Sequence, residues 1–322
     1  MLIGQEALQQ RLLGQLRADR TVHAYLISGP AGSGKRTLAA WWAQTLLCRD
    51  PQKNGGCGKC PACIRVQSGN HPDLLRIRVE KGEAAGVGTA RMLVEELPVR
   101  PYEGGKKILI IEDADLLTVQ AQNALLKSLE EPPLYARFIL TASNIQSILP
   151  TVRSRCSIIR TVPVGEKPMA ALLKEQGMDP LRIAAACAQS QGSVGQALAF
   201  CKDETLYARR TRAAEMLEQL LEEKQTSIPR LVGIFRKERS EAIMILDAWH
   251  SLIEDALVAR VGAKQRMNPD FGGLVDKMAR LFTTRTLKGM INEVYRTRAQ
   301  IFGNANAAMA AERMLARIVE EM

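Results

Sequence analysis

Hydrophobic and polar positions follow two different patterns along this chain of 322 residues. In the first half, short apolar runs at 24–28, 74–79, 107–111, 137–141 and 157–162 predict β-strands. Amphipathic segments at 34–47, 89–97 and 118–131 lie between these runs and predict helices. Because strands that alternate with helices form parallel sheets covered by helices, we expect an α/β domain over residues 1–163.

The second half of the pattern is helical. After Pro163 and Gly165, apolar residues recur at helical spacing in 167–176, 179–189 and 193–201, which predicts a small helical domain over 164–205. Longer helical patterns at 206–223, 241–261, 285–301 and 305–322 predict a helical bundle over 206–322. The expected fold class is therefore α/β plus all-α.

Composition and charge narrow the class of protein. Hydrophobic residues make up 46% of the chain and charged residues 24%, as in ordinary globular proteins with a buried core. No apolar run approaches the roughly 18 residues of a membrane helix, and Glu6 and Arg11 interrupt any signal-peptide pattern, so we expect a cytoplasmic protein without membrane contact. The formal charge of +10 permits binding near nucleic acid, but a basic solvated surface explains it equally well.

A glycine-rich turn, Gly-Pro-Ala-Gly-Ser-Gly-Lys, follows the first predicted strand and precedes a predicted helix. In that setting backbone N–H groups and a lysine bind the phosphates of a nucleotide such as ATP or ADP. Arg36 stands where a serine or threonine would hold Mg²⁺, and the next residue is turned by about 100° around the helix. A plain glycine turn is the alternative. The candidate nucleotide-binding residues are Gly29, Gly32, Gly34, Lys35 and Thr37.

Two acidic residues, Glu112 and Asp113, end the apolar run at 108–111. Carboxylates in this place hold Mg²⁺ and polarise water in nucleotide hydrolases. Their usual order is aspartate then glutamate, and here it is reversed. Together with Arg36, the reversal argues against ATP hydrolysis by this chain. The alternative is a solvated strand end.

Cysteines are concentrated in one segment at about 48–63. Four of the seven have the spacing Cys-x8-Cys-x2-Cys-x2-Cys, namely Cys48, Cys57, Cys60 and Cys63. Four thiolates suit tetrahedral Zn²⁺, and a closed set of four indicates a structural zinc module. A disulfide is disfavoured in the cytoplasm. Cys187 and Cys201 occupy apolar helical positions and are expected to be core thiols.

Two more segments carry candidate function. Residues 123–133 form a predicted helix that Pro132 and Pro133 stop. A short polar loop, Ser154-Arg155-Cys156, precedes the last predicted strand. An arginine at a domain edge can reach a neighbour's nucleotide in trans and neutralise charge on the transferred phosphoryl group. The alternative is an ordinary surface arginine.

Taken together, the segments GPAGSGK, CGKCPAC, GNHPDL, IIEDADLL, NALLKSLEEPP and SRC closely resemble those of bacterial DNA polymerase III clamp-loader subunits, in the AAA+ superfamily. The resemblance covers residues 3 to about 205 and extends more weakly to Asn304-Ala305-Asn306. It implies an AAA+ P-loop domain with a parallel sheet and a zinc loop, a small three-helix lid domain and a C-terminal helical collar domain. It also places Thr141 at the position of the first sensor.

Departures from the family pattern imply which kind of subunit this is. The ATP-hydrolysing gamma/tau subunit carries threonine after the loop lysine, Asp-Glu on the acidic strand and an arginine in its second sensor. The corresponding residues here are Arg36, Glu112-Asp113 and Gly195, whereas the SRC arginine is retained. The resemblance thus implies a largely non-hydrolysing stator of the DNA polymerase III holoenzyme that offers Arg155 to a neighbour's ATP. Its partners would be the gamma/tau and delta subunits and, through the complex, the sliding clamp and primed DNA.

Two other functions remain open on the sequence. A gamma/tau-like, DNA-dependent AAA+ ATPase would need the metal-holding hydroxyl and the sensor arginine that this chain lacks. A zinc-dependent nucleic-acid-binding module would need aromatic residues among its cysteines for base stacking, but nearby there are only the charges of Lys59 and Arg65.

Overall fold

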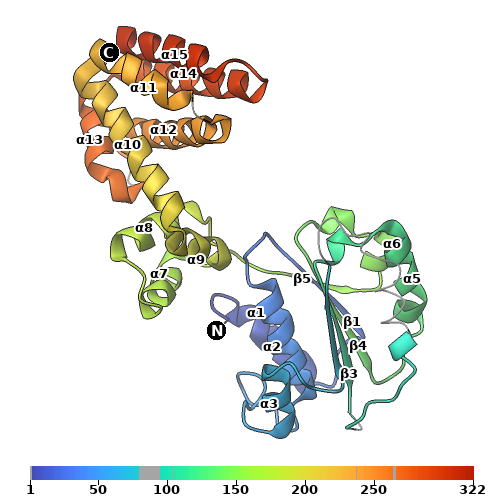
Figure 1. Cartoon of the computed structure of the whole chain (residues 1–322). Coiled ribbons are helices and arrows are strands. Elements are labelled where there is room, and N and C mark those ends of the chain that lie inside the picture. The colour runs from blue at the N-terminus through green and yellow to red at the C-terminus, as the bar shows by residue number, and fades with distance from the viewer. Residues whose placement is uncertain (1, 80–94, 104, 237, 264–265) are drawn as a thin grey trace. The chain divides into compact units, whose positions relative to one another are not determined.

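The computed structural model describes residues 2–79, 95–103, 105–236, 238–263 and 266–322 (Figure 1). The chain divides into two compact units. The first contains Met1–Met169 and Gly192–Gly195, and the second contains Ala170–Gln191 and Gln196–Met322. The second unit thus joins most of the expected lid segment to the bundle, so the separate domain over 164–205 stays a prediction.

A five-stranded parallel sheet organises the first unit. Its strand order is β2-β3-β4-β1-β5, and all five predicted strands are confirmed. Because the strands are parallel, the loop after β1 and the acidic end of β3 meet at the carboxyl edge, where ligands bind in such sheets. The strands are β1 (Ala24–Ser28), β2 (Leu74–Arg78), β3 (Lys107–Glu112), β4 (Ala136–Ala142) and β5 (Ser157–Arg160).

Helices cover both faces of this sheet (Figure 1). One face packs against α1 (Glu6–Arg17) and α2 (Lys35–Leu47), and the other against α5 (Val119–Glu130) and α6 (Pro150–Arg153). On β1, Tyr25 and Ile27 point to the first core and Ala24 and Leu26 to the second. Burial on both sides explains why the inner strands β1, β3 and β4 are largely apolar without alternation.

Helix boundaries follow local capping signals. The predicted helix at 118–131 is confirmed as α5, where Oγ1 of Thr118 accepts a hydrogen bond from the N–H of Ala121 at 3.2 Å. A short helix, α3 (Pro61–Gln67), lies among the cysteines and was not predicted. Two 3₁₀ turns, η1 (Ala114–Leu116) and η2 (Ile145–Ser147), follow strands. Most of the predicted helix at 89–97 lies outside the described residues.

Helices alone follow β5 in the described part of the chain. The helices α11 and α13 were not predicted, because α11 contains Pro229 and Gly233 and α13 begins with two glycines, and such residues indicate turns. Trp249 is fully buried in the bundle, and its indole N–H donates to the carbonyl of Ala213 at 2.7 Å. The helices are α7 (Glu166–Glu175), α8 (Pro180–Gln189), α9 (Val194–Lys202), α10 (Glu204–Glu223), α11 (Ile228–Phe235), α12 (Arg239–Arg260), α13 (Gly272–Leu281), α14 (Thr284–Phe302) and α15 (Ala307–Glu321), with 3₁₀ turns η3 (Lys224–Ser227) and η4 (Pro269–Phe271).

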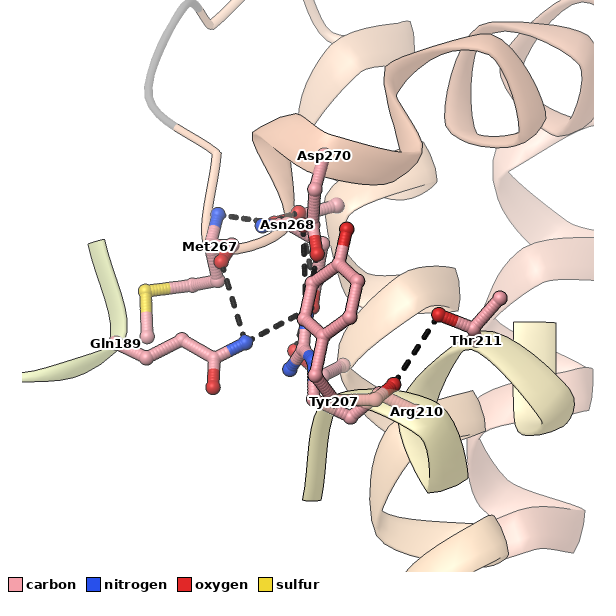
Figure 2. A network of polar contacts seen from close by, with 9 residues as sticks. Gln189, Tyr207, Arg210, Thr211, Met267, Asn268 and Asp270 are labelled. Atoms are coloured by element: carbon pink, nitrogen blue, oxygen red, sulfur yellow. Dashed lines mark hydrogen bonds and ion pairs between the residues drawn. The ribbon is translucent and has the colours of Figure 1, made fainter. Parts of the chain in front are cut away.

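A buried amide, Asn268, connects three helices of the second unit. Its Oδ1 accepts hydrogen bonds from Gln189 of α8 at 3.2 Å and from Arg210 of α10 at 3.1 Å. Its Nδ2 donates to Ser251 at 2.8 Å and to Asp255 at 3.0 Å, both on α12. Figure 2 shows Gln189 and Arg210 converging on Asn268. This network fixes α8 to the bundle helices.

Among the described residues, no helix is both long enough and apolar enough to cross a bilayer.

Candidate functional site

Lys35 contacts the glycine-rich turn that precedes it, residues 29–34, which we call the phosphate loop. Lys35 is the first residue of α2, and Nζ donates to the carbonyls of Gly29 at 2.8 Å and Pro30 at 2.9 Å. Burial lowers the pKa of Lys35, and the charge of Asp113 partly opposes this effect. Gly34 has φ +83°, a left-handed conformation that favours glycine. The backbone at Gly34 therefore favours glycine, and the lysine that follows it is hydrogen-bonded to backbone oxygens.

Residues 192–195 form hydrogen bonds with the same loop. Oγ of Ser193 donates to the carbonyl of Ala31 at 2.9 Å, and the N–H of Gly195 donates to the carbonyl of Gly32 at 2.9 Å. A Cβ atom at Gly195 would lie 2.8 Å from Cα of Gly32, closer than real Cβ contacts. Any side chain, including a sensor arginine, would therefore force these two backbone segments apart.

The guanidinium of Arg36 contacts both acidic residues at the end of β3. Arg36 is ion-paired with Asp113, and its Nε lies 3.5 Å from Oε2 of Glu112. Glu112 is buried and also accepts a hydrogen bond from Nε of Arg76 at 2.6 Å, while Nε of Arg78 lies 4.0 Å from Asp113. Mg²⁺ binds free carboxylate and phosphate oxygens. Because three guanidinium groups engage these two carboxylates, the residues present do not fit a magnesium–nucleotide site.

Two predicted site residues, Thr37 and Thr141, have different surroundings. Thr37 is exposed on α2. Thr141 is fully buried on β4, and its Oγ1 accepts a hydrogen bond from the N–H of Asp113 at 3.0 Å. Asp113 has φ +56°, which is uncommon for a residue other than glycine. Thr141 therefore holds the end of the acidic strand in this conformation.

Two further guanidinium groups of this site, those of Arg76 and Arg78, were not predicted from the sequence. They are two residues apart on β2, which pairs with β3, and Arg78 stands opposite Glu112 in the register. The pattern Arg-Ile-Arg in an edge strand was the available signal, because residues i and i+2 point to the same face. Only the strand order shows that this face meets the acidic residues.

The four predicted cysteine ligands come together around one point. Their Sγ atoms all lie within 4.8 Å of one another, with Cys48–Cys60 and Cys57–Cys63 separations of 4.0 Å. Four sulfurs bound to one tetrahedral zinc would be about 3.8 Å apart. Backbone N–H groups of Cys57, Cys60 and Cys63 point at Sγ atoms of the set from 3.2, 3.3 and 3.4 Å. The cluster can therefore hold a metal such as zinc.

Side chains of helix α2 form hydrogen bonds with the backbone of the cysteine segment. The indole N–H of Trp41 donates to the carbonyl of Asn54 at 3.1 Å, and Oγ1 of Thr45 accepts from the N–H of Gly56 at 3.2 Å. A Cβ atom at Gly55 would lie 2.5 Å from Nε1 of Trp41, so this close approach requires glycine. The same helix thus carries the phosphate loop at its beginning and the cysteine cluster near its end.

Arg155 lies far from this loop in the topology of the sheet. It lies two residues before β5, so it belongs to the amino edge of the parallel sheet, whereas the phosphate loop follows β1 at the carboxyl edge. Its NH1 donates to the carbonyl of Thr151 at 2.8 Å, and its NH2 lies 2.5 Å from Oε1 of Glu130. About a third of the side chain is exposed. Arg155 is therefore placed to act on something outside its own loop.

Comparisons with known families agree with this geometry. The profile of the family described as DNA polymerase III, delta subunit, matches residues 4–164, and that described as DNA polymerase III, delta subunit, C terminal, matches residues 205–320. The chain is 33% identical over 294 residues to DNA polymerase III subunit delta' of Escherichia coli K12, covering 91% of this chain and 86% of that protein. It is 28% identical over 323 residues to subunit delta' of Bacillus subtilis 168, covering 98% and 96%.

Similarity also extends to another subunit type. DNA polymerase III subunit tau/gamma of Haemophilus influenzae is 32% identical over 206 residues, which cover 62% of this chain and 30% of that protein. A parallel five-stranded sheet with a glycine-rich turn after β1 and these relatives define the class, a subunit of DNA polymerase III. Within that class, the chain belongs to the family of delta' subunits.

Proposed function

We propose that this subunit assists clamp loading without hydrolysing ATP and supplies Arg155 in trans to the ATP of a neighbouring gamma/tau subunit. The observation that carries the first part is the Arg36 guanidinium, which contacts Glu112 and Asp113 where a hydrolase would need free metal ligands. Two other contacts support the same conclusion. Nζ of Lys35 donates to carbonyls of its own loop, and Gly195 packs so closely against Gly32 that a sensor arginine would not fit there. The gamma/tau-like ATPase is the second candidate, and this geometry disfavours it.

The role of Arg155 is supported by its place in the fold. It lies at the opposite edge of the sheet from the chain's own phosphate loop, so its own loop is out of reach. A partly exposed guanidinium there can hydrogen-bond a phosphate presented by another molecule and stabilise negative charge on it.

The proposed partners follow from the relatives of this chain, which are subunits of DNA polymerase III. Gamma/tau and delta subunits would flank this chain, and the sliding clamp and primed DNA would be met through the complex in the bacterial cytoplasm. Exposed apolar side chains on α14 and α15 offer surface for a neighbour, notably Tyr295, Phe302 and Met309. These helices belong to the segment that matches the C-terminal profile.

The cysteine cluster is proposed to bind structural Zn²⁺. Cys48, Cys57, Cys60 and Cys63 would supply all of its ligands, so no open position is left for a substrate or water. The metal would fix the segment that connects α2 to α3, and catalysis would not involve it.

Steady-state ATPase activity tests the proposed function. We expect no turnover from the chain alone. In the complex with gamma/tau, delta, clamp and primed DNA, we expect Arg155→Ala to lower turnover strongly, because an arginine acting in trans contributes about 10³–10⁵-fold in related phosphoryl transfers. Arg153→Ala is the matched control, because Arg153 contacts Gln146 within its own subunit. DNA-stimulated turnover by the chain alone, indifferent to Arg155→Ala, would instead favour the ATPase.

A further inference from the structure

Two sequence motifs that lie far apart in the chain meet through one ion pair. Glu130 is the last residue of α5, in the segment stopped by Pro132, and Arg155 follows α6. NH2 of Arg155 lies 2.5 Å from Oε1 of Glu130. NH1 donates to the carbonyl of Thr151 at 2.8 Å. The second guanidinium nitrogen is therefore held by an acidic residue and the first by backbone.

The backbone around this pair is firmly fixed. Leu129, next to Glu130 on α5, and Val152 of α6, three residues before Arg155, are buried in one hydrophobic cluster. Gln122 of α5 donates to the carbonyl of Ser147 at 3.0 Å and accepts from the N–H of Leu149 at 2.8 Å, which ties the loop before α6 to α5. With both helices anchored, a change of partner at Arg155 requires only side-chain rotation.

The charges favour a pair that can exchange. Glu130 carries negative charge at the carboxyl end of a helix, where the helix dipole disfavours it, and Arg155 compensates that charge. The two side chains are 47% and 33% exposed, so water screens their attraction. A phosphate with more charge and more acceptor oxygens is a stronger partner for a guanidinium group.

We propose that Glu130 is a positioning residue for Arg155, an exchangeable counter-ion that occupies the guanidinium until a phosphate of the neighbouring subunit's nucleotide replaces it. This inference rests on the proposed function. The carboxylate competes with the phosphate and also repels it, so its charge lowers the affinity of the assembled site for ATP.

The test is the ATP dependence of turnover by the reconstituted complex containing Glu130→Gln. Glutamine keeps an acceptor oxygen for Arg155 and removes the charge. We expect kcat/KM for ATP to rise about two- to fivefold, the range that an exposed ion pair of up to about 1 kcal/mol allows. The gain should shrink at high salt. Glu131→Gln, an adjacent exposed acid, is the matched control and should leave kcat/KM unchanged.

The double variant Glu130→Gln/Arg155→Ala shows whether the effect passes through Arg155. We expect the gain to vanish in the Arg155→Ala background, whereas a general structural effect would persist there. An unchanged or lower kcat/KM in Glu130→Gln alone, or an equal gain in both backgrounds, would overturn the role of Glu130. If Arg155→Ala by itself leaves turnover at the wild-type level, the proposed trans function fails instead, so the two failures are distinguishable.

Discussion

Arg36 contacts Asp113 across the carboxyl edge of the sheet and thereby joins the helix after β1 to the end of β3. Arg36, which stands where a nucleotide hydrolase is expected to carry a metal-holding hydroxyl, supplies positive charge to the acidic end of β3. Glu112 and Asp113 are retained with Arg36, Arg76 and Arg78 as their counter-ions. An ion-pair network thus joins the beginning of α2 to the ends of β2 and β3.

This network should contribute to stability. Arg36→Ala leaves Asp113 without its nearest cation and removes one of two from buried Glu112, so we expect the free energy of unfolding to fall by about 1–2 kcal/mol. Urea denaturation measures this change. Arg36→Lys keeps the charge without the guanidinium fork and should lose less. Equal stability of Arg36→Ala and wild type would contradict the role of the network.

The close backbone contact between Gly195 and Gly32 leads to a second prediction. Gly195→Ala should destabilise the first unit by about 1–3 kcal/mol, because its Cβ atom would lie 2.8 Å from Cα of Gly32. Gly14→Ala is the matched control, since Gly14 lies inside α1 with open space around it. That variant should gain about 0.5–1 kcal/mol. Denaturant midpoints of both variants check this, and a loss of similar size at the two positions would contradict it.

Metal analysis tests the cysteine cluster. Protein purified in the presence of zinc should contain about one zinc per chain, and Cys63→Ser should reduce this content to near zero. Chelation should expose the segment between α2 and α3 to proteolysis, because its Sγ atoms would lose the metal ion that they bind together. Cys201→Ser, a buried cysteine outside the cluster, should keep its zinc. Full zinc content in Cys63→Ser would rule out the proposed ligand set.

Stability should fall in mild acid because of His71. Burial lowers the pKa of His71, although Glu103 and Asp73 partly oppose this, and its Nδ1 accepts a hydrogen bond from the N–H of Asp73 at 3.1 Å. The unfolded chain, with a histidine pKa near 6.5, therefore binds more protons than the folded chain in the window below that value. The contribution of neutral His71 to the free energy of unfolding is complete above about pH 6.5 and is lost as the pH falls.

His71→Asn provides the comparison for this titration. Asparagine keeps an acceptor oxygen near the N–H of Asp73 but does not titrate, so the difference in unfolding free energy between wild type and variant should change between pH 7.5 and 5.5. A difference that stays constant across this range would show that His71 titrates alike in the folded and unfolded states.

Asn268 should be important for the second unit. Asn268→Ala removes the acceptor of Gln189 and Arg210 and the donor to Ser251 and Asp255, so we expect a loss of about 1–3 kcal/mol (Figure 2). Thermal or urea unfolding measures it. Asn292→Ala on the exposed side of α14 is the control and should be neutral or slightly stabilising. Comparable losses for both variants would contradict the assigned network.

Much of the fold could be predicted because its signals are local. The five strands, α5 with its cap at Thr118 and the set of four cysteines all depend on residues close in sequence. The helices α3, α11 and α13 were not predicted, because proline or glycine residues within them indicate turns.

The sequence by itself determined the fold class and the family resemblance and indicated the candidate site residues, because residue type and spacing carry that information. Only the tertiary structure decided what those residues contact. Arg36 lies 77 positions from Asp113 and Glu130 lies 25 from Arg155, and Gly195 meets Gly32 across 163 residues. Such contacts depend on strand order and on how helices pack across a sheet, and no local pattern encodes either.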